Sequence, residues 1–312
     1  MRSATGSVSV SVVIATHERP ELLRAALDAV LGQDHCGPIE CIVVFDRSVP
    51  DPSLEQLSTS TEFAGPRSIR TVANDNSPGL AGARNTGIGE STAPWIAFCD
   101  DDDVWTSSKL TQQFRALAER PAGVCVTGIV VLYGDHETVR LPPGERLTID
   151  ELVTRRVTAA HPSTVLVERT HLLDRVGTVD EEIPGSYAED YDWMLRAARV
   201  GDITVVREPL VRVRWGASKF SKDWPTIVDA IDYLVAKHPE FGSSHSGMAR
   251  MRGRRAIGEA ARGHRRQAVS DATAAIRLSW RDPRPYVALA VASKLVSSDR
   301  LLDMAHRRGR GI

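Results

Sequence analysis

Short runs of β-branched and other apolar residues recur in the first hundred positions, and each run ends in polar residues. The runs at 8–14, 39–45 and 95–99 are almost wholly apolar, which is typical of central strands covered on both faces. Between the first two runs, apolar residues recur at helical spacing, at Leu22, Leu23, Ala26, Leu27, Val30 and Leu31. Strands that alternate with helices predict an α/β fold with a mostly parallel central sheet and right-handed crossovers.

Weaker versions of the same patterns predict the later elements. We expect a helix over about 52–62, a strand at 68–72 and a glycine-rich helix start at 79–89. Further along the chain we expect strands at 124–132, 163–167 and 203–213, and a helix at 189–199. From about residue 224 onward the pattern predicts helices alone, including 248–262, 265–279 and 283–296. The chain is therefore divided into a flexible N-terminus (1–7), an α/β domain (8–222) and a helical C-terminal region (223–312).

The length and composition are those of an ordinary globular enzyme. The chain has 312 residues, 42% of them hydrophobic and 25% charged, enough for a large core without cross-links. Three of the four cysteines (Cys41, Cys99 and Cys125) lie in apolar runs, and no CxxC pair is present, which favours buried thiols over a disulfide or zinc site. No stretch of about 18 apolar residues is uninterrupted, and residues 1–7 lack the apolar segment of a secretory signal. We expect a cytoplasmic protein.

Charge is distributed unevenly, although the net formal charge is only −1. Residues 241–312 hold 15 Lys/Arg against 5 Asp/Glu, which leaves 24 against 35 for residues 1–240. Two interpretations stay open: a solvated helical surface packed on an acidic neighbour, or a peripheral membrane patch for anionic lipid headgroups or a phosphorylated carrier. Nucleic acid is not an expected partner, because few aromatic residues are interleaved with the arginines. A homodimer is also left open.

Three polar segments follow predicted strands, at 15–19, at Asp46 and at 100–103. Because ligands of open α/β sheets bind beyond the carboxyl ends of the strands, we expect these segments to form one site. Residues two apart in an extended chain point the same way, so Asp100 and Asp102 share one face of the strand end. Paired carboxylates suit a divalent cation such as Mn²⁺ or Mg²⁺. The alternative is an acidic loop that caps the helix beginning near Thr106.

Four segments occur in a distinctive order and spacing. They are Ser11-Val-Val-Ile-Ala-Thr-His-Glu-Arg-Pro-Glu-Leu-Leu23, Val43-Val-Phe-Asp46, Gly79-Leu-Ala-Gly-Ala-Arg-Asn-Thr-Gly87 and Ile96-Ala-Phe-Cys-Asp-Asp-Asp-Asp-Val-Trp105. Over roughly residues 8–218 the chain resembles the family 2 glycosyltransferases of the GT-A fold. The resemblance implies a Rossmann-like α/β domain and an inverting transfer of sugar from a nucleoside diphosphate, most often UDP, with Mn²⁺ or Mg²⁺ as cofactor. It does not distinguish between the possible acceptors, which are a hydroxyl of a glycan, of a lipid-linked sugar or of a small molecule.

The same resemblance implies roles for individual residues. The nucleotide-binding set is Ala15, Thr16, Glu18, Asp46, Arg84, Asp100 and Asp101. Within it, Ala15, Thr16 and Asp46 hold the nucleobase, Arg84 faces the nucleotide, and Asp100 lies by the ribose. Asp102 binds the metal that bridges the diphosphate. The family's usual strand ending is Asp-Asp-Gly-Ser, whereas this chain reads Phe45-Asp46-Arg47-Ser48, so the second aspartate is kept and the first is absent.

A second acidic segment, Tyr187-Ala-Glu-Asp-Tyr-Asp-Trp-Met-Leu-Arg196, is similar to the family's Glu-Asp motif at the start of a helix. The acceptor hydroxyl must lose its proton as it attacks the anomeric carbon, and a nearby carboxylate can take it. We predict Asp190 as this base, with Glu189 and Asp192 as the nearest competitors. The alternative is simple charge complementarity at a helix N-terminus.

Other side chains are candidates for acceptor or diphosphate contacts. The family often carries Arg-x-His before the domain ends, where this chain has Val211-Arg-Val-Arg214-Trp215. An arginine cannot bind metal but can pair with phosphate. We therefore predict that Arg214, together with Lys219, stabilises the departing diphosphate. The alternative is a structural ion pair of Arg214 with a carboxylate. His161 is a candidate for the acceptor side or an ordinary hydrogen-bonded histidine. Trp193 and Trp215 would stack on a sugar or acceptor ring, or belong to the core.

Other protein classes are disfavoured on specific grounds. Sugar-phosphate nucleotidyltransferases need a glycine-rich loop with Arg or Lys after the first strand, and residues 15–20 contain no glycine. A processive polysaccharide synthase is disfavoured because the chain has no Gln-x-x-Arg-Trp stretch and no membrane channel is predicted. A non-catalytic nucleotide-sugar-binding module stays open, since one aspartate and one histidine of the family pattern are missing.

Overall fold

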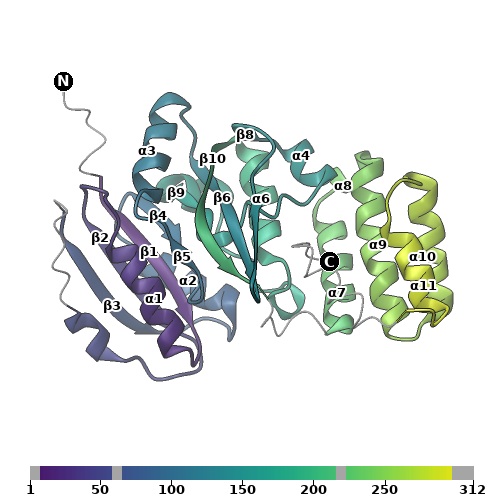
Figure 1. Ribbon diagram of the computed structural model, residues 1–312, viewed down its shortest axis with the longest axis horizontal. Helices are drawn as coiled ribbons and strands as arrows, with labels where there is room; N and C mark the ends of the chain where they lie inside the picture. The colour runs from purple at the N-terminus through teal and green to yellow at the C-terminus, as the bar shows by residue number, and fades with distance from the viewer. Residues whose placement is uncertain (1–7, 58–64, 216–222, 297–312) are drawn as a thin grey trace.

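The computed structural model describes residues 8–57, 65–215 and 223–296. In these residues a sheet of ten strands has the order β3-β2-β1-β4-β9-β6-β10-β5, with β7 paired to β6 and β8 paired to β10 (Figure 1). Its strands are β1 (Val10–Thr16), β2 (Ile39–Phe45), β3 (Arg67–Ala73), β4 (Trp95–Phe98), β5 (Val104–Trp105), β6 (Val124–Tyr133), β7 (His136–Arg140), β8 (Arg146–Leu147), β9 (Leu166–Glu168) and β10 (Ile203–Arg214).

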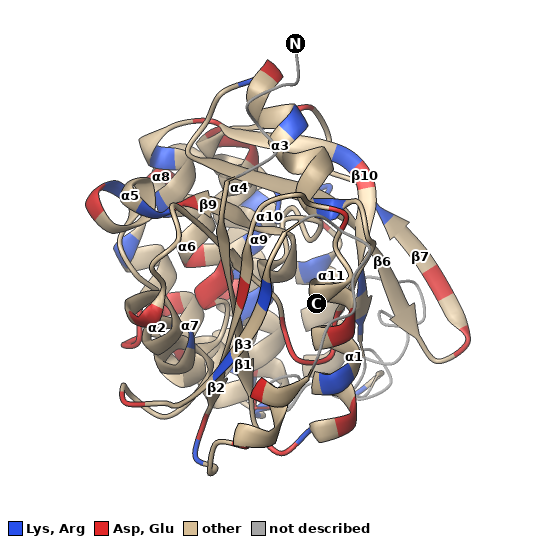
Figure 2. Ribbon diagram, turned by 90° about the vertical axis from the view of Figure 1, so that its left-hand side faces the viewer, with Lys and Arg blue, Asp and Glu red and all other residues tan. Residues whose placement is uncertain are grey.

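The first four strands form a parallel half-sheet, as the sequence predicts. β9 then runs antiparallel to both β4 and β6, while β6 and β10 are parallel to each other. The sheet is therefore mixed beyond β4, and the predicted α/β class with a mostly parallel core is confirmed. The hairpin of β6 and β7 extends past the other strands at one side of the molecule (Figure 2).

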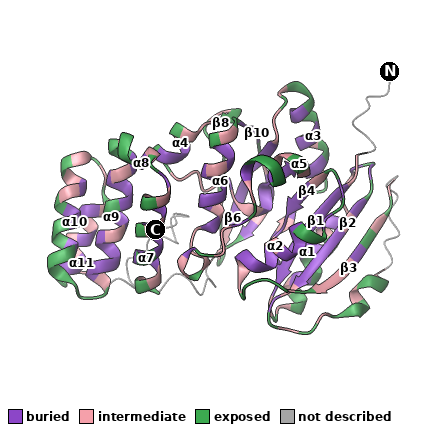
Figure 3. Ribbon diagram, turned by 180° about the vertical axis from the view of Figure 1, so that it is seen from behind, coloured by how far each residue is buried: buried purple, intermediate pink, exposed green. Residues whose placement is uncertain are grey.

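Helices cover both faces of the sheet because the strand side chains alternate. Val12 and Ile14 of β1 belong to a core cluster with α1 (Pro20–Leu31) and α3 (Lys109–Glu119). Val13 and Ala15 point the other way, into a cluster with α2 (Leu80–Glu90) and α6 (Glu189–Val200). Figure 1 shows α1 on the near face, and Figure 3, from behind, shows α2 on the opposite face with the strands buried between them.

The glycines of α2 let this helix lie against β1. A Cβ on Gly87 would lie 2.2 Å from Val13 Cγ1, a distance that no side chain tolerates. Gly79, just before the helix, has φ 122°, which favours glycine. The close approach places the N-terminus of α2 beside the carboxyl ends of β1 and β2.

Several elements differ from their predicted form. The helix predicted over 52–62 is a short 3-10 helix, η2 (Pro52–Gln56), and residues 58–64 lie outside the described chain. The strand predicted at 163–167 begins instead as the 3-10 helix η3 (Pro162–Thr164) before β9. The remaining short elements of the α/β part were not predicted: β5, β7, β8, α4 (Ile149–Thr154), α5 (Arg169–His171), the π-helical turn η4 (Leu172–Val176) and η5 (Pro184–Ser186).

The described part of the C-terminal region, residues 223–296, is built from helices. It comprises α7 (Trp224–Lys237), α8 (Glu240–Ser243), α9 (His245–Ala261), α10 (Arg265–Leu278) and α11 (Arg284–Ala292). α7 shares the core cluster of α6, and α9 packs against α7 and α4, so the helical region is joined to the α/β part (Figure 1). α10 and α11 pack on α9 through small residues such as Ala256, Ala272 and Ala288. Across the described ranges, no helix combines the length and apolar character needed to cross a membrane.

Candidate active site

The carboxyl ends of β1 and β2 meet around Asp46. Its backbone N–H donates to the Thr16 carbonyl at 2.9 Å, and its carboxylate accepts from Asn74 Nδ2 (2.9 Å), the Gly79 N–H (3.0 Å) and Arg47 Nε (2.9 Å). Burial alone would raise the pKa of Asp46, but these donors together hold it below its ordinary value. Asp46 is therefore an anion that anchors the start of α2 at the sheet edge.

Two loops at this edge contain residues in the left-handed region. Glu18, after β1, has φ 54°, and Arg47, after β2, has φ 51°. Such conformations are uncommon for residues other than glycine and cluster at functional sites. Glu18 is exposed on its loop, whereas Ala15 and Thr16 at the end of β1 are buried.

The acidic turn after β4 is tied to the β1 loop. The Thr16 hydroxyl donates to Asp101 Oδ2 at 2.8 Å, and Arg19 donates to Asp101 (3.2 Å) and to Asp102 (2.9 Å). Burial and the neighbouring negative charges of Asp100 and Asp101 raise the pKa of Asp102 to about 6, although the positive charge of Arg19 opposes this rise. Of the residues predicted for the nucleotide and the metal, Thr16, Asp101 and Asp102 are therefore connected by hydrogen bonds, through Arg19 in the case of Asp102.

Arg84 connects the acidic turn to helix α6. The guanidinium is buried, and it donates to Asp100 at 2.6 Å and, through its other terminal nitrogen, to Glu189. Burial raises the pKa of Glu189 to about 7, in spite of the opposing charge of Arg84. Arg84 thus holds two acidic groups from opposite sides of the site in fixed positions.

Asp190 follows Glu189 but faces different groups. Its carboxylate accepts from Arg156 at 3.2 and 3.3 Å, and it lines a cavity of about 370 Å³ together with His161 and Trp215. Burial would raise its pKa, but the charges of Arg156, His161 and Arg84 hold it below the ordinary value. Asp190 is an ionised carboxylate at neutral pH, which is the state a general base needs.

His161 lies at the border between the acidic turn and this cavity. Its Nδ1 is 3.3 Å from Asp103 Oδ2, and its Nε2 is 3.9 Å from Asp100 Oδ2. The Ser163 hydroxyl donates to Asp103 at 2.5 Å. Burial lowers the pKa of His161, so that the neutral imidazole, the form that binds metals, is favoured.

A divalent cation fits this end of the sheet. Among the described residues, Asp100, Asp103 and His161 each offer a ligand atom, and these three atoms lie within 4.8 Å of one another. Asp102, the metal ligand predicted from the sequence, lies on the same turn and makes its ion pair with Arg19. The donor set of carboxylates and one imidazole suits Mn²⁺ or Mg²⁺.

Two predicted acceptor contacts are not brought to the cavity. Asp192 is fully buried on another side of α6, where it accepts from Arg196 and His238 at 2.9 Å and pairs with Lys237 at 2.7 Å. Trp193 is buried too and donates its indole N–H to the Gly177 carbonyl at 3.1 Å. Both side chains join α6 to its neighbours and form part of the protein's internal packing.

The end of β10 lies beside both the acidic turn and the cavity. The Arg214 side chain is exposed, and its backbone N–H donates to Asp103 Oδ1 at 3.4 Å, which ties β10 to the acidic turn. Trp215 lines the cavity beside Asp190. Lys219 lies outside the described residues.

Several site residues were missed by the sequence reasoning. Arg19 lies in the motif segment 11–23, but the family resemblance implies no role for it. Its position before Pro20 places it in the loop that contacts Asp101. Arg156, Arg250 and Arg254 line the cavity from segments that carry no family pattern. The spacing of Arg250 and Arg254, four apart on one helix face, was the available signal.

Comparison with known proteins agrees with this geometry. Residues 11–173, just over half of the chain, match the family model described as Glycosyl transferase family 2. The chain belongs to glycosyl transferase family 2. It is therefore a glycosyltransferase that uses a nucleotide sugar, and the resemblance stated from its motifs is confirmed.

Relatives of this family 2 enzyme include bacterial transferases. The amylovoran biosynthesis glycosyltransferase AmsB of Erwinia amylovora is 28% identical over 65% of this chain and 68% of its own length. The UDP-Glc:α-D-GlcNAc-diphosphoundecaprenol β-1,3-glucosyltransferase WfgD of Escherichia coli is 28% identical over 73% of this chain and 88% of its own.

Solved structures show the same fold. S. aureus TarS (residues 1–349) in complex with UDP-GlcNAc superposes with a TM-score of 0.63 at 16% identity, covering 97% of this chain and 92% of that one. The mannosyltransferase PcManGT of Pyrobaculum calidifontis, in complex with GDP-Man and Mn²⁺, gives a TM-score of 0.52 at 17% identity over 96% and 80% of the two chains. The family 2 enzyme accordingly has the GT-A fold, with its C-terminal helices as an extension.

Proposed function

We propose that this family 2 enzyme transfers a sugar from a UDP-sugar to an acceptor hydroxyl with inversion at the anomeric carbon. The observation that carries the proposal is the position of Asp190. It is an ionised carboxylate that lines a cavity, and it is joined through Glu189 and Arg84 to the acidic turn where the nucleotide would lie. UDP is supported by the UDP-sugar in the name of WfgD and by the UDP-GlcNAc complex of TarS.

The donor would lie along the carboxyl ends of β1, β2 and β4. In this arrangement the nucleobase is held by the β1 loop at Ala15 and Thr16 and by Asp46, and the ribose lies near Asp100. Arg84 and Asp101 complete the nucleotide site by fixing the acidic turn from both sides.

The cation would be held by Asp102, with Asp100, Asp103 and His161 as the neighbouring donors. When bound, a divalent cation offsets the negative charge that builds on the departing nucleoside diphosphate. Asp103 is 1% exposed and accepts from Ser163 and from the Arg214 N–H, so its own function would be to orient the turn and His161. Asp102 is more accessible to a ligand, with 22% of its side chain exposed.

Asp190 would act as the base in a single displacement. The acceptor oxygen forms a bond to the anomeric carbon as the bond from that carbon to the diphosphate oxygen breaks, and the diphosphate keeps the electron pair. The acceptor proton passes to Asp190. Attack from the face opposite the leaving group turns an α-linked donor into a β-linked product, and no covalent enzyme intermediate is needed. Arg156 would keep Asp190 ionised and correctly oriented.

A panel of nucleotides and nucleotide sugars tests this proposal. Thermal unfolding of the protein is recorded with UDP, GDP and dTDP and their sugars, each with and without Mn²⁺, since a ligand that binds the folded state raises Tm. UDP-sugars with Mn²⁺ are expected to give the largest rise and to be consumed slowly to UDP by water. Asp102→Asn should remove the Mn²⁺-dependent part of both effects.

Two results would count against it. If the protein is stabilised by UDP-sugar but never releases UDP, with or without candidate acceptors, it is a binding module. If Asp102→Asn behaves as wild type while His161→Ala loses the effect of Mn²⁺, the cation is held by Asp100, Asp103 and His161 without Asp102.

A further inference from the structure

The cavity beside Asp190 is lined by guanidinium groups from two separate parts of the chain. Arg156 comes from the segment after α4, and Arg250 and Arg254 come one turn apart from α9 of the C-terminal region. Arg140 and Arg284 also line it. The α/β part of the molecule supplies the base, and the helical extension supplies much of the positive charge that faces it.

Arg250 and Arg254 are buried, and within the described part of the chain neither of them pairs with a carboxylate. Arg250 is 4% exposed, and it donates to the Val153 carbonyl (3.0 Å) and to the Tyr191 hydroxyl (2.5 Å), while its Nε has no hydrogen-bond partner. Arg254 is 9% exposed and donates to the Tyr187 hydroxyl. These acceptors are neutral oxygens, so the two positive charges are not compensated by an anion. Leaving a charge buried in this way is costly unless it is paired.

The other titratable groups around the cavity do not supply the missing negative charge. Among the described residues that line the cavity, Asp190 is the one carboxylate, and Arg156 already pairs with it. Arg284 is neutralised by its own partner, Asp282, at 3.1 Å. Burial and the nearby positive charges of Arg156, Arg250 and Arg284 together lower the pKa of Arg254 to about 10. Arg250 and Arg254 thus carry positive charges that disfavour each other.

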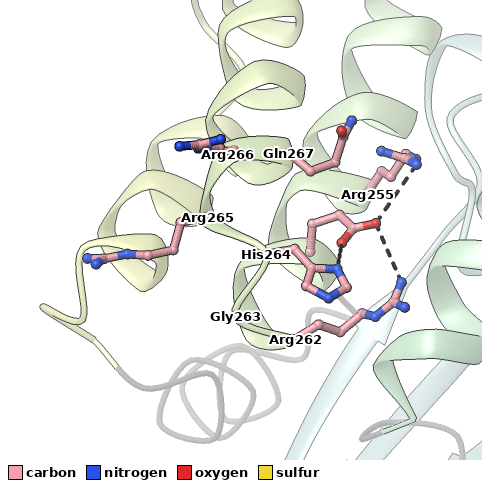
Figure 4. A pocket seen from close by; sticks show the side chains of 8 residues that line it. Arg255, Arg262, Gly263, His264, Arg265, Arg266 and Gln267 are labelled. Carbon is pink, nitrogen blue, oxygen red and sulfur yellow. Dashed lines mark hydrogen bonds and ion pairs between the residues drawn. The ribbon is translucent and has the colours of Figure 1, made fainter.

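A second basic cluster of the same region shows what compensated arginines look like. At the turn between α9 and α10, Glu259 faces His264 at 2.7 Å, Arg262 at 3.5 Å and Arg255 at 3.8 Å (Figure 4). In this cluster on the surface of the helical extension, the positive charges face a carboxylate. The cavity beside Asp190 differs, because Arg250 and Arg254 donate there to neutral oxygens.

We propose that this cavity binds a phosphoryl group of the acceptor, so that the enzyme glycosylates a hydroxyl that lies close to a phosphate or diphosphate. The inference rests on the proposed function, because it takes Asp190 as the base that faces this hydroxyl. Arginine forks bind phosphate oxygens in a bidentate way, and several guanidinium groups around one cavity match an anion with several oxygens better than a single carboxylate. The donor diphosphate belongs on the other side of Asp190, at the acidic turn reached through Arg84.

Isothermal titration calorimetry with simple anions tests the proposal on the whole chain. Inorganic phosphate and glycerol 3-phosphate are titrated into protein saturated with UDP and Mg²⁺, so that the donor site is occupied. Both are expected to bind with Kd of order 1 mM or tighter, and acetate is expected to bind at least about tenfold more weakly. No detectable phosphate binding by the wild-type protein, or equal binding of acetate, would overturn the proposal; the second result would point to a carboxylate acceptor.

Substitutions on α9 locate the site. Arg250→Gln and Arg254→Gln are each expected to weaken phosphate binding by about tenfold or more. Arg252→Gln is the matched control, because this exposed arginine lies on the same helix and outside the cavity. Unchanged phosphate affinity in both cavity variants would overturn the assignment. Should a glutamine variant fail to fold, Arg254→Lys, which keeps the charge but loses the fork, is expected to show an intermediate affinity.

Two further measurements distinguish a failure of this inference from a failure of the proposed function. UDP binding with Mn²⁺ is expected to be the same in wild type, Arg250→Gln and Arg252→Gln. If none of these three proteins binds UDP, the proposed function itself is wrong. Vesicles containing phosphatidylglycerol distinguish a lipid headgroup from a soluble phosphate. We expect glycerol 3-phosphate to bind without vesicles, and binding to vesicles alone would overturn a phosphate site inside the cavity.

Discussion

Glu189 and Asp190 are adjacent in the chain, yet their surroundings favour opposite protonation states. Burial raises the pKa of Glu189 to about 7, whereas Arg156, His161 and Arg84 outweigh burial at Asp190 and hold its pKa low. Asp190 also faces the cavity, while Glu189 is turned toward Arg84. These surroundings support the proposal that Asp190 is the base and that Glu189 positions Arg84.

Replacing Asp190 with asparagine isolates the proton transfer. The amide oxygen can still accept from Arg156, so the fold and the donor site should be retained. We expect kcat to fall by about 10²–10⁴-fold with unchanged UDP affinity and Tm. Asp202→Asn, the same change at an exposed position after α6, is the control and should leave kcat unaltered. A fully active Asp190→Asn enzyme would transfer the role of base to Glu189.

Lys109 offers a test of stability that is independent of the active site. It is fully buried, donates to Gln113 Oε1 at 2.9 Å and lies over the Trp105 ring, and burial lowers its pKa to about 7 from an ordinary 10.5. The unfolded state then binds more protons between these values, so this group makes the folded state more stable as pH rises from 7 toward 10.5.

Lys109→Met removes that dependence. The stability of the wild type relative to this variant, measured by urea unfolding, is expected to rise by about 2–3 kcal/mol between pH 7 and pH 9, since one pH unit corresponds to about 1.4 kcal/mol in this range. A difference that is flat with pH would show that Lys109 keeps its ordinary pKa.

At the scale of elements, helix α2 depends on a small number of glycines. Gly87 faces Val13 so closely that a methyl group would lie 2.2 Å from Cγ1, whereas a Cβ on Gly89, two residues later, would meet nothing within 4 Å. The helix carries Arg84 and begins beside Asp46, so the closeness of its packing fixes the geometry of the nucleotide site.

These two glycines form a matched pair for substitution. Gly87→Ala is expected to lower the free energy of unfolding by about 1–3 kcal/mol, because the added methyl group must displace β1 or α2. Gly89→Ala should be neutral or stabilising by up to about 1 kcal/mol, since alanine favours helix. Urea unfolding of both variants measures the difference. Equal stabilities would mean that α2 is free to move away from the sheet.

The elements that the sequence predicted are those whose patterns are local. β1, β2 and β4 are runs of buried apolar residues, and α6 and β10 end within one residue of the predicted positions. β7 and β8 have few apolar residues, and they exist because β6 and β10 offer them partners, so no periodicity marks them. The helix predicted over 52–62 is a 3-10 helix in its described part, with no buried side chain to support a longer one.

At the scale of the whole molecule, the sequence marks the residues that we propose for the donor but not those of the cavity beside Asp190. Asp46, Asp100 and Asp102 follow buried strands of a parallel sheet, and the carboxyl ends of such strands lie at one edge of the sheet. The cavity instead joins Arg156 to Arg250 and Arg254, which are about a hundred residues apart and are brought together by the packing of α9 on α4 and α7. The helical extension therefore supplies part of the lining of this cavity.

In the proposed mechanism the donor lies at the acidic turn with its anomeric carbon facing Asp190. A crystal structure of the protein with a UDP-sugar and Mn²⁺ would locate the donor. We expect the uracil beside Thr16 and Asp46, Mn²⁺ held by Asp102 near the diphosphate, and Asp190 on the face of the sugar opposite the diphosphate. A nucleotide bound at any other cleft, or a sugar turned away from Asp190, would contradict it.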